Sequence, residues 1–174
     1  MKVADFNRIS DEEASSLMEN CCGASRWVRG MVAGRPYAGL PELLARADRE
    51  WRDTGPDDWE EAFSQHPRIG ETRTEAPAGE AARRWSAAEQ GSLAAVDAGA
   101  RQALARANRE YEERFGRIYI VSASGRSPEE LLQDLRGRMA NSPEQELAIA
   151  AAEQGRITRQ RLSRVFADEG AGNP

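Results

Sequence analysis

The residue in this chain best suited to proton transfer is its single histidine, His66, in the sequence SQHPRIGE. An unperturbed imidazole has a pKa near neutrality, so it can act as a general acid or base under physiological conditions. A lone histidine can equally well be a core or helix-capping group. Pro67 favours the catalytic role, because a helix that ends before this proline would hold the imidazole on a stiff support.

A second group of polar residues lies in the sequence WSAAEQ, which contains Ser86, Glu89 and Gln90. Ser86 and Glu89 have the spacing of a capping box, in which both side chains bind backbone N–H groups at a helix start. A serine, a carboxylate and an amide at a helix N-terminus would equally suit a polar, anionic small molecule. Gln90 has no part in a capping box, and the residues alone leave the two interpretations open.

An arginine near the C-terminus is a candidate for binding a substrate carboxylate. Arg161 lies in QGRITRQRLSRV, beside the apolar positions Ile157, Leu162 and Val165. Most arginines on a polar helix are solvated, but this position next to the apolar stripe would let the guanidinium reach inward. A guanidinium can hold a carboxylate with two hydrogen bonds.

The composition argues against several other classes of site and partner. With one histidine and two adjacent cysteines, Cys21 and Cys22, the chain lacks the ligands of a typical metal site, and we expect free, partly buried thiols. It has no Gly-rich phosphate loop and no nucleophile elbow. The chain has 24 Lys and Arg against 29 Asp and Glu, and the resulting net charge of −5 argues against a general nucleic-acid binder.

Membrane association and secretion are not indicated either. No apolar run approaches the roughly 20 residues that span a bilayer. The sequence MKVADFNRIS lacks the apolar region of a signal peptide. We therefore predict a cytoplasmic protein with no membrane partner.

The elements that must position these residues are predicted to be helices, because Ala, Leu, Glu, Arg and Gln are abundant and enter helices at little cost. Ser10 with Glu13 marks one helix start, and Pro41 lies in the first turn of another. Ser127 and Ser142, each followed by a proline, mark two more. The predicted helices cover residues 10–23, 25–34, 40–55, 55–66, 85–116 with a break near 97–99, 127–139 and 142–166.

Two stretches are predicted not to be helical. Residues 70–85 lose apolar periodicity and gain Thr, Pro and Gly, which indicates a mobile loop. RIYIVSASG, residues 117–125, is β-branched and aromatic but has no neighbouring strand, so we expect a buried extended segment. The prediction is an all-α, single-domain bundle of about eight helices over residues 1–174, with one short buried extended segment and a frayed tail at 167–174.

Taken together, these segments resemble the 2-oxo-4-hydroxy-4-carboxy-5-ureidoimidazoline (OHCU) decarboxylases of urate degradation. Their order and spacing over almost the whole chain make the resemblance specific. The matching stretches are FN at residues 6–7, CCGASRWV, RPYAGLPELLARAD, HPRIGE, WSAAEQ, ANREYEERFG, SGRSPEELLQDLRGRMAN and ITRQRL.

The resemblance implies an all-helical, usually homodimeric enzyme that needs no cofactor or metal and converts a small-molecule ureidoimidazoline to (S)-allantoin and CO2. It implies that His66 is the catalytic histidine, with Pro67 beside it, and that Arg161 is the C-terminal arginine of the site. Glu89 is expected to be catalytic, and Ser86 and Gln90 to contact the substrate. The residues expected to line the pocket, largely through backbone groups, are Tyr119, Ile120, Val121, Ser122 and Ala123.

The chain departs from the family pattern just before this segment. Many members read Phe-Gly-x-Pro-Phe, whereas this chain has Ile118 in place of the proline. The proposed side-chain groups all remain. Two other functions stay open: a non-catalytic helical module that binds ureides or acts as a scaffold, and a lyase or hydrolase acting on a related ureido acid.

Overall fold

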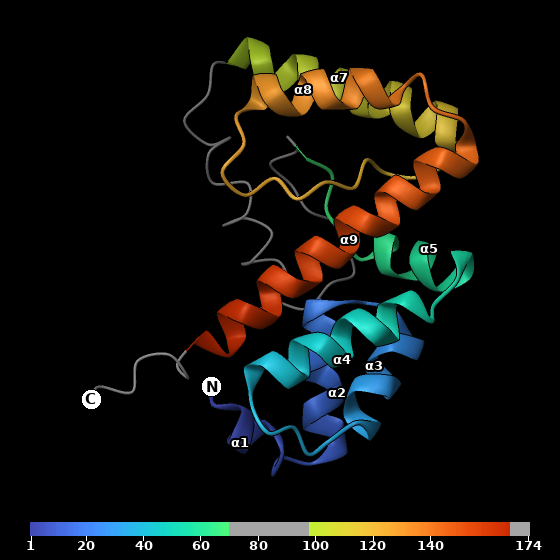
Figure 1. Cartoon of the computed structure of the whole chain (residues 1–174). Coiled ribbons are helices and arrows are strands. Elements are labelled where there is room, and N and C mark those ends of the chain that lie inside the picture. The colour runs from blue at the N-terminus through green and yellow to red at the C-terminus, as the bar shows by residue number, and fades with distance from the viewer. Residues whose placement is uncertain (70–97, 168–174) are drawn as a thin grey trace. The chain divides into compact units, whose positions relative to one another are not determined.

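The computed structural model of this 174-residue chain describes residues 1–69 and 98–167, and this part is helical, with no strand (Figure 1). The all-α prediction is confirmed. The predicted loop at 70–85 and the helix start at Ser86 lie outside the described residues. The described helices are α1 (Val3–Phe6), α2 (Asp11–Cys21), α3 (Ser25–Ala33), α4 (Leu40–Arg52), α5 (Pro56–Ser64), α7 (Ala98–Phe115), α8 (Pro128–Arg138) and α9 (Pro143–Val165).

The predicted helix starts are confirmed by reciprocal hydrogen bonds between side chain and backbone. Ser10 Oγ accepts from the N–H of Glu13 at 3.2 Å, and the Glu13 carboxylate accepts from the N–H of Ser10 at 3.0 Å. Ser127 with Glu130, and Ser142 with Gln145, form the same arrangement at α8 and α9. An N-cap side chain contributes about 1 kcal/mol, so these local patterns largely determine where the helices begin. The four-residue α1 has no such pattern, and the sequence did not predict it.

The chain divides into two compact units, one of residues 1–62 and 155–174, the other of residues 63–154. The predicted single domain over residues 1–174 stays a prediction. In the first unit α3 packs against both α2 and α4. Asn7 fixes the chain before α4: its amide donates to the C=O of Tyr37 at 2.8 Å and accepts from the N–H of Tyr37 at 3.0 Å. Trp27 is fully buried and donates to the C=O of Ala47 at 3.1 Å.

In the second unit, α7 and α8 lie side by side and share one core with the segment that joins them (Figure 1). On α7 the side chains of Leu104, Tyr111 and Phe115 recur at helical spacing and are all buried. Gly116 ends this helix with a φ of 69°, a left-handed conformation that suits glycine. The buried residues of this core are Ile69, Leu104, Ala107, Tyr111, Phe115, Tyr119, Val121, Ala123, Leu131 and Leu135.

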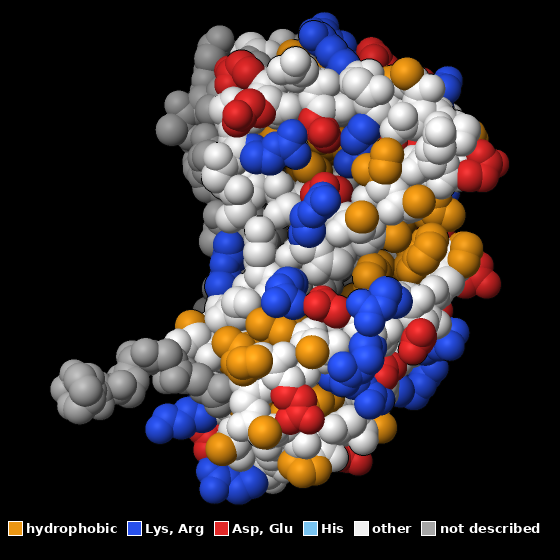
Figure 2. All heavy atoms as spheres, viewed as in Figure 1, with side chains coloured by type: hydrophobic (Ala, Val, Ile, Leu, Met, Phe, Trp, Pro, Cys, Tyr) orange, Lys and Arg blue, Asp and Glu red, His pale blue; other side chains and the backbone are white. Residues whose placement is uncertain are grey.

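The surface carries charges of both signs. Figure 2 shows Lys and Arg side chains interspersed with Asp and Glu over the face in view. Among the described helices, none combines the length and the apolar character that crossing a membrane requires.

Candidate active site

His66 lies in the turn that follows α5, as the sequence predicted from the proline after it. The N–H of His66 donates to the C=O of Phe63 at 3.0 Å, and Phe63 is 1% exposed. The side chains of His66 and Pro67 are half-buried. The backbone of the turn is therefore attached to a buried anchor, while the imidazole keeps a partly accessible position.

The chain just after His66 is held by α7. The side-chain amide of Asn108, 3% exposed, donates to the C=O of Ile69 at 3.0 Å. The guanidinium of Arg68 donates to both carboxylate oxygens of Glu112, at 2.7 and 2.9 Å. Neither Asn108 nor Glu112 was predicted from the sequence to belong to the site. The indication for Asn108 was its polar side chain on the otherwise apolar face of α7.

The segment 119–123 is non-helical, as predicted. Four of its residues are buried and Ser122 is half-buried, whereas Ser124 and Gly125, at the end of the predicted stretch, are exposed. The side chains of Tyr119, Val121 and Ala123 enter the core of the second unit, which is the alternation expected of an extended chain. The backbone is held from two helices. Arg138 Nη1 on α8 donates to the C=O of Ile120 at 2.9 Å, and on α9 the carboxylate of Glu153 accepts from the N–H of Ser122 at 2.8 Å.

Arg138 lies in a buried network of charged and phenolic groups. Its guanidinium forms a salt bridge with Glu146, which is fully buried and also accepts from the hydroxyl of Tyr111. The ring of Tyr119 lies 4.8 Å from the guanidinium carbon, and the Tyr119 hydroxyl donates to Asp134. A buried ion pair needs further hydrogen bonds to offset its desolvation, and these neighbours supply them.

This network alters the ionisation of its members. Burial opposes the charged form of Arg138, but the hydrogen bond to Glu146 and the electrostatic interactions with Tyr111, Glu146 and Tyr119 outweigh it, so the pKa of Arg138 is raised. Burial, and then the hydrogen bond to Asp134, raise the pKa of Tyr119 well above its usual value. Burial and the neighbouring Glu146 raise the pKa of Tyr111 in the same way. At neutral pH the arginine is therefore cationic and both phenols are protonated.

Arg161 belongs to the first unit and is 5% exposed, which confirms the prediction that this position reaches inward. Its Nη1 donates to the C=O of Asn20 at 3.3 Å. Cys22 is nearby, and burial raises its pKa to about 11, with smaller opposing contributions from backbone and Thr158 hydrogen bonds and from the charge of Arg161. Both cysteines are free and buried, as expected from the sequence.

The structure brings some of the predicted site residues together. Ile69, three positions after His66, packs in the same core as Tyr119, Val121 and Ala123, so the histidine turn and the extended segment belong to one packed unit. Ser86, Glu89 and Gln90 lie outside the described residues. The roles assigned to all of these side chains stay predictions.

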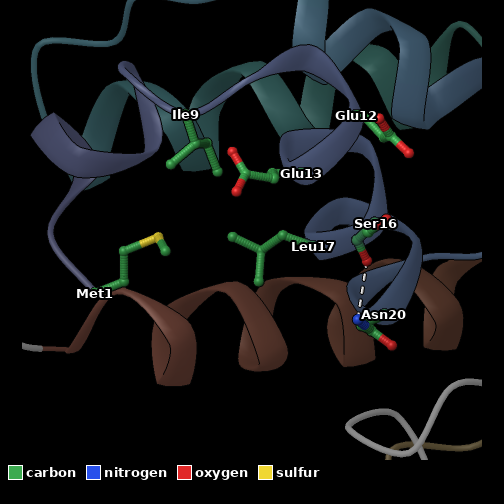
Figure 3. A pocket seen from close by; sticks show the side chains of 7 residues that line it. All are labelled: Met1, Ile9, Glu12, Glu13, Ser16, Leu17 and Asn20. Atoms are coloured by element: carbon green, nitrogen blue, oxygen red, sulfur yellow. Dashed lines mark hydrogen bonds between the residues drawn. The ribbon is translucent and has the colours of Figure 1, made fainter.

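A pocket of about 460 Å³ lies in the first unit, beside the N-terminus and α2 (Figure 3). None of the predicted site residues lines it. Its lining includes Glu12 and Glu13, and the Glu13 carboxylate lies among the apolar side chains of Ile9 and Leu17. Two carboxylates disfavour an anionic ligand, so we do not assign the substrate to this pocket. In residues 1–69 and 98–167, no three His, Cys, Asp or Glu side chains are grouped so that they could hold a metal ion.

Comparisons of sequence identify related proteins. The model of the OHCU decarboxylase family matches residues 7–163. The chain is 37% identical over 149 residues to the uric acid degradation bifunctional protein TTL of Arabidopsis thaliana, covering 86% of this chain and 46% of that protein. It thus spans about half the length of this relative. It is 30% identical over 173 residues to the 2-oxo-4-hydroxy-4-carboxy-5-ureidoimidazoline decarboxylase of Amia calva, covering 95% of each chain.

Comparisons of structure agree with these matches. A crystal structure of an OHCU decarboxylase in the presence of (S)-allantoin is similar with a TM-score of 0.76 and 36% identity, covering 92% of this chain and all of that one. A crystal structure of an (S)-allantoin synthase is similar with a TM-score of 0.63 and 18% identity, covering 94% of this chain and 54% of that one. The second match concerns the fold alone.

Proposed function

Because the chain belongs to the OHCU decarboxylase family, we propose that it converts OHCU to (S)-allantoin and CO2. The comparisons confirm three predictions from the sequence: the family, the fold and the lyase class. Within the structure, the observation that most supports the proposal is the common core of the histidine turn and the segment 119–123. A half-buried imidazole and a fixed backbone segment are thereby kept in one packed unit.

The reaction breaks the bond between the substrate carboxylate and its carbon, and CO2 leaves without the bonding electron pair. The pair is received by the adjacent carbonyl and ring nitrogen, giving an enolate-like state, and one proton is then added to one face of the carbon. We assign this proton exchange to His66, whose backbone is fixed while its side chain stays half-buried. Because the substrate's own groups receive the charge, this scheme requires no metal or electron-sink cofactor.

The remaining roles concern the orientation of the substrate. In this proposal the guanidinium of Arg161 holds the substrate carboxylate. Glu89 takes part in catalysis by hydrogen bonding to the ureido and ring groups, and Ser86 and Gln90 bind the same groups. Pro67 fixes the position of the histidine. A site that binds only one prochiral orientation of the intermediate will deliver the proton to one face, which accounts for a single enantiomer.

The backbone of the segment 119–123 is assigned to the pocket lining. Val121 supports this assignment: the residue as a whole is 5% exposed, and no hydrogen bond joins its peptide N–H or C=O to another residue of the described chain. Buried peptide groups are nearly always paired with protein, water or ligand. The peptide groups of Val121 thus offer one donor and one acceptor to a ureido compound.

Two further features belong to the same proposal. We assign the protein to the cytoplasm and expect it to form a homodimer, as members of the family usually do. Size-exclusion chromatography with light scattering measures the dimer directly, and a monomeric mass at micromolar concentration would contradict it.

The activity is tested by generating OHCU from urate with the upstream enzymes and following its consumption with and without this protein. Wild type is expected to accelerate the reaction, and His66→Ala to lower kcat by about 10²- to 10⁴-fold, the usual contribution of a general acid or base. Gln65→Ala, at the half-buried neighbouring position, is the matched control and is expected to retain activity. Far-UV circular dichroism verifies that the helices are intact in both variants.

The outcomes separate the alternatives. Binding of OHCU without turnover would favour a non-catalytic ureide-binding module. Turnover of another ureido acid, but not of OHCU, would favour a different lyase or hydrolase. Full activity of His66→Ala, with wild type active, would refute the role of the histidine and leave the decarboxylase assignment in place.

A further inference from the structure

We propose that Arg138 and Glu153 are positioning residues that fix the peptide groups on either side of Val121 and aim the Val121 N–H and C=O at the substrate. The inference rests on the proposed function, since it takes the segment 119–123 to be part of the pocket lining. Neither Arg138 nor Glu153 was singled out from the sequence as a site residue.

The two side chains bind consecutive peptide groups. Arg138 donates to the C=O of Ile120 at 2.9 Å, and this oxygen belongs to the peptide that joins Ile120 to Val121. Glu153 accepts from the N–H of Ser122 at 2.8 Å, and this nitrogen belongs to the peptide that joins Val121 to Ser122. Both bonds involve a charged partner, and such bonds are roughly twice as strong as neutral ones.

Peptide geometry then determines where the groups of Val121 point. In a planar trans peptide the C=O and the N–H point in opposite directions. Both peptides next to Val121 are trans, because the cis bond in the described chain is Arg35–Pro36. The N–H of Val121 therefore points away from the guanidinium that binds Ile120, and the C=O of Val121 points away from the Glu153 carboxylate. Neither the N–H nor the C=O of Val121 therefore faces Arg138 or Glu153, and both groups can bind a ligand.

The guanidinium of Arg138 is itself held in place, so it can fix the direction of the Ile120 C=O. Glu146, on α9, accepts from its Nε at 2.7 Å and also from its Nη2. The second oxygen of Glu146 accepts from the amide of Asn141 at 2.7 Å, and the rings of Tyr111 and Tyr119 lie near the guanidinium. With its side chain constrained on all these sides, Arg138 fixes the C=O of Ile120 in one direction.

The two bonds lie close to the position where the chain departs from the family pattern. Ile118 occupies the place where many family members have a proline, so the backbone lacks the restraint of a proline ring just before the segment. The bonds from Arg138 and Glu153 restrain Ile120 and Ser122, two and four positions later. They supply rigidity where the substrate would contact the backbone.

The test compares Glu153→Leu, which removes the acceptor for Ser122, with Glu153→Gln, which keeps an acceptor oxygen. Glu144→Leu, at an exposed position in the first turn of the same helix, controls for the introduction of a leucine. Each variant is assayed with OHCU for kcat, KM and the enantiomeric excess of the allantoin formed, and its melting temperature is recorded. We expect Glu153→Leu to lower kcat/KM by about 10-fold, the equivalent of one weakened hydrogen bond to substrate, and to lower the enantiomeric excess.

Rescue distinguishes positioning from a purely structural role. Glu153→Gln and Glu144→Leu are expected to keep the enantiomeric excess of wild type. If Glu153→Leu loses melting temperature but its product has the wild-type enantiomeric excess, the positioning role is overturned. If Glu153→Leu does not fold, Arg138→Lys replaces it, because one ammonium lacks the geometry of a guanidinium to hold both Glu146 and Ile120.

Failure of the inference is distinct from failure of the proposed function. An active wild type together with a Glu153→Leu variant of unchanged kcat/KM and enantiomeric excess would overturn the inference and leave the decarboxylase in place. An inactive wild type would overturn both.

Discussion

The histidine turn, residues 65–69, and the segment 119–123 pack in one core but are held by different kinds of bond. The turn is attached through the neutral amide of Asn108 and through the ion pair of Arg68 with the half-buried Glu112. The segment is attached through Arg138, which is 6% exposed, and through the carboxylate of Glu153.

The difference follows from what each region has to present. In our proposal the functional group of the turn is the His66 side chain, so a fixed backbone is sufficient there. The functional groups proposed for the segment are the peptide N–H and C=O of Val121, whose direction depends on the peptide planes. The bond from Arg138 is buried and charge-assisted, and the half-buried bond to Glu153 is charge-assisted as well; such bonds set those planes more firmly than the neutral bond from Asn108. The comparison therefore predicts large effects in the network of the segment and small ones around the turn.

The largest effect on stability is expected from Arg138→Met. This change leaves the fully buried Glu146 without its cation, and breaking a buried pair in this way costs about 3–5 kcal/mol. Urea unfolding measures the loss. The double variant Arg138→Met with Glu146→Leu is expected to recover part of it, since no uncompensated charge remains. A single variant that loses less than about 1 kcal/mol, the value typical of an exposed pair, would remove the basis of the comparison.

A smaller effect is expected from Asn108→Leu. The change leaves the C=O of Ile69 without its donor, at a cost of about 1–3 kcal/mol. Because the turn is attached through this bond, kcat should fall along with the free energy of unfolding. Unchanged kcat in a measurably destabilised variant would show that Asn108 holds the core and not the catalytic turn.

The network also predicts that the free energy of unfolding depends on pH. The pKa of Tyr119 is raised above its usual value of 10.0, so the unfolded chain loses this proton first as pH rises. Its contribution to stability is fully present below pH 10 and decreases above it, by about 1.4 kcal/mol per pH unit. Urea unfolding between pH 9 and 11 should therefore show a steeper decline for wild type than for Tyr119→Phe. Equal slopes would contradict the assigned pKa direction.

The smallest effect is expected from Arg68→Ala. Arg68 is exposed, and exposed ion pairs contribute about 0–1 kcal/mol. The free energy of unfolding should change little, and salt should reduce the difference further. A loss above about 2 kcal/mol would place this pair with the buried network and would remove the contrast between the two regions.

Local patterns in the sequence were enough to predict most of the fold. The capping pair Ser10–Glu13 joins residues three positions apart and forms as expected, and Ser127, marked by the proline after it, is the N-cap of α8. Pro67 placed His66 at a helix end, and apolar periodicity placed Arg161 on the inner side of its helix. Each of these inferences needs only one turn of chain, which is why it could be made without a structure.

The bonds that hold the site could not be predicted, because they join distant residues. Arg138 is 18 positions from Ile120, and Ser122 is 31 positions from Glu153. Asn108 is 39 positions from Ile69. Such pairs depend on how α7, α8 and α9 pack, and nothing in the local sequence distinguishes a buried arginine that binds a backbone carbonyl from a solvated one. The family itself was predicted from the sequence and is confirmed, while the roles of Ser86, Glu89 and Gln90 stay predictions.

The most direct test of the account is the stereochemistry of the product. OHCU decays spontaneously to racemic allantoin, so circular dichroism of freshly formed allantoin reports whether the protein controls protonation. The account predicts an excess of (S)-allantoin, formed faster than the uncatalysed decay. Racemic allantoin at the uncatalysed rate, from folded wild-type protein, would contradict it.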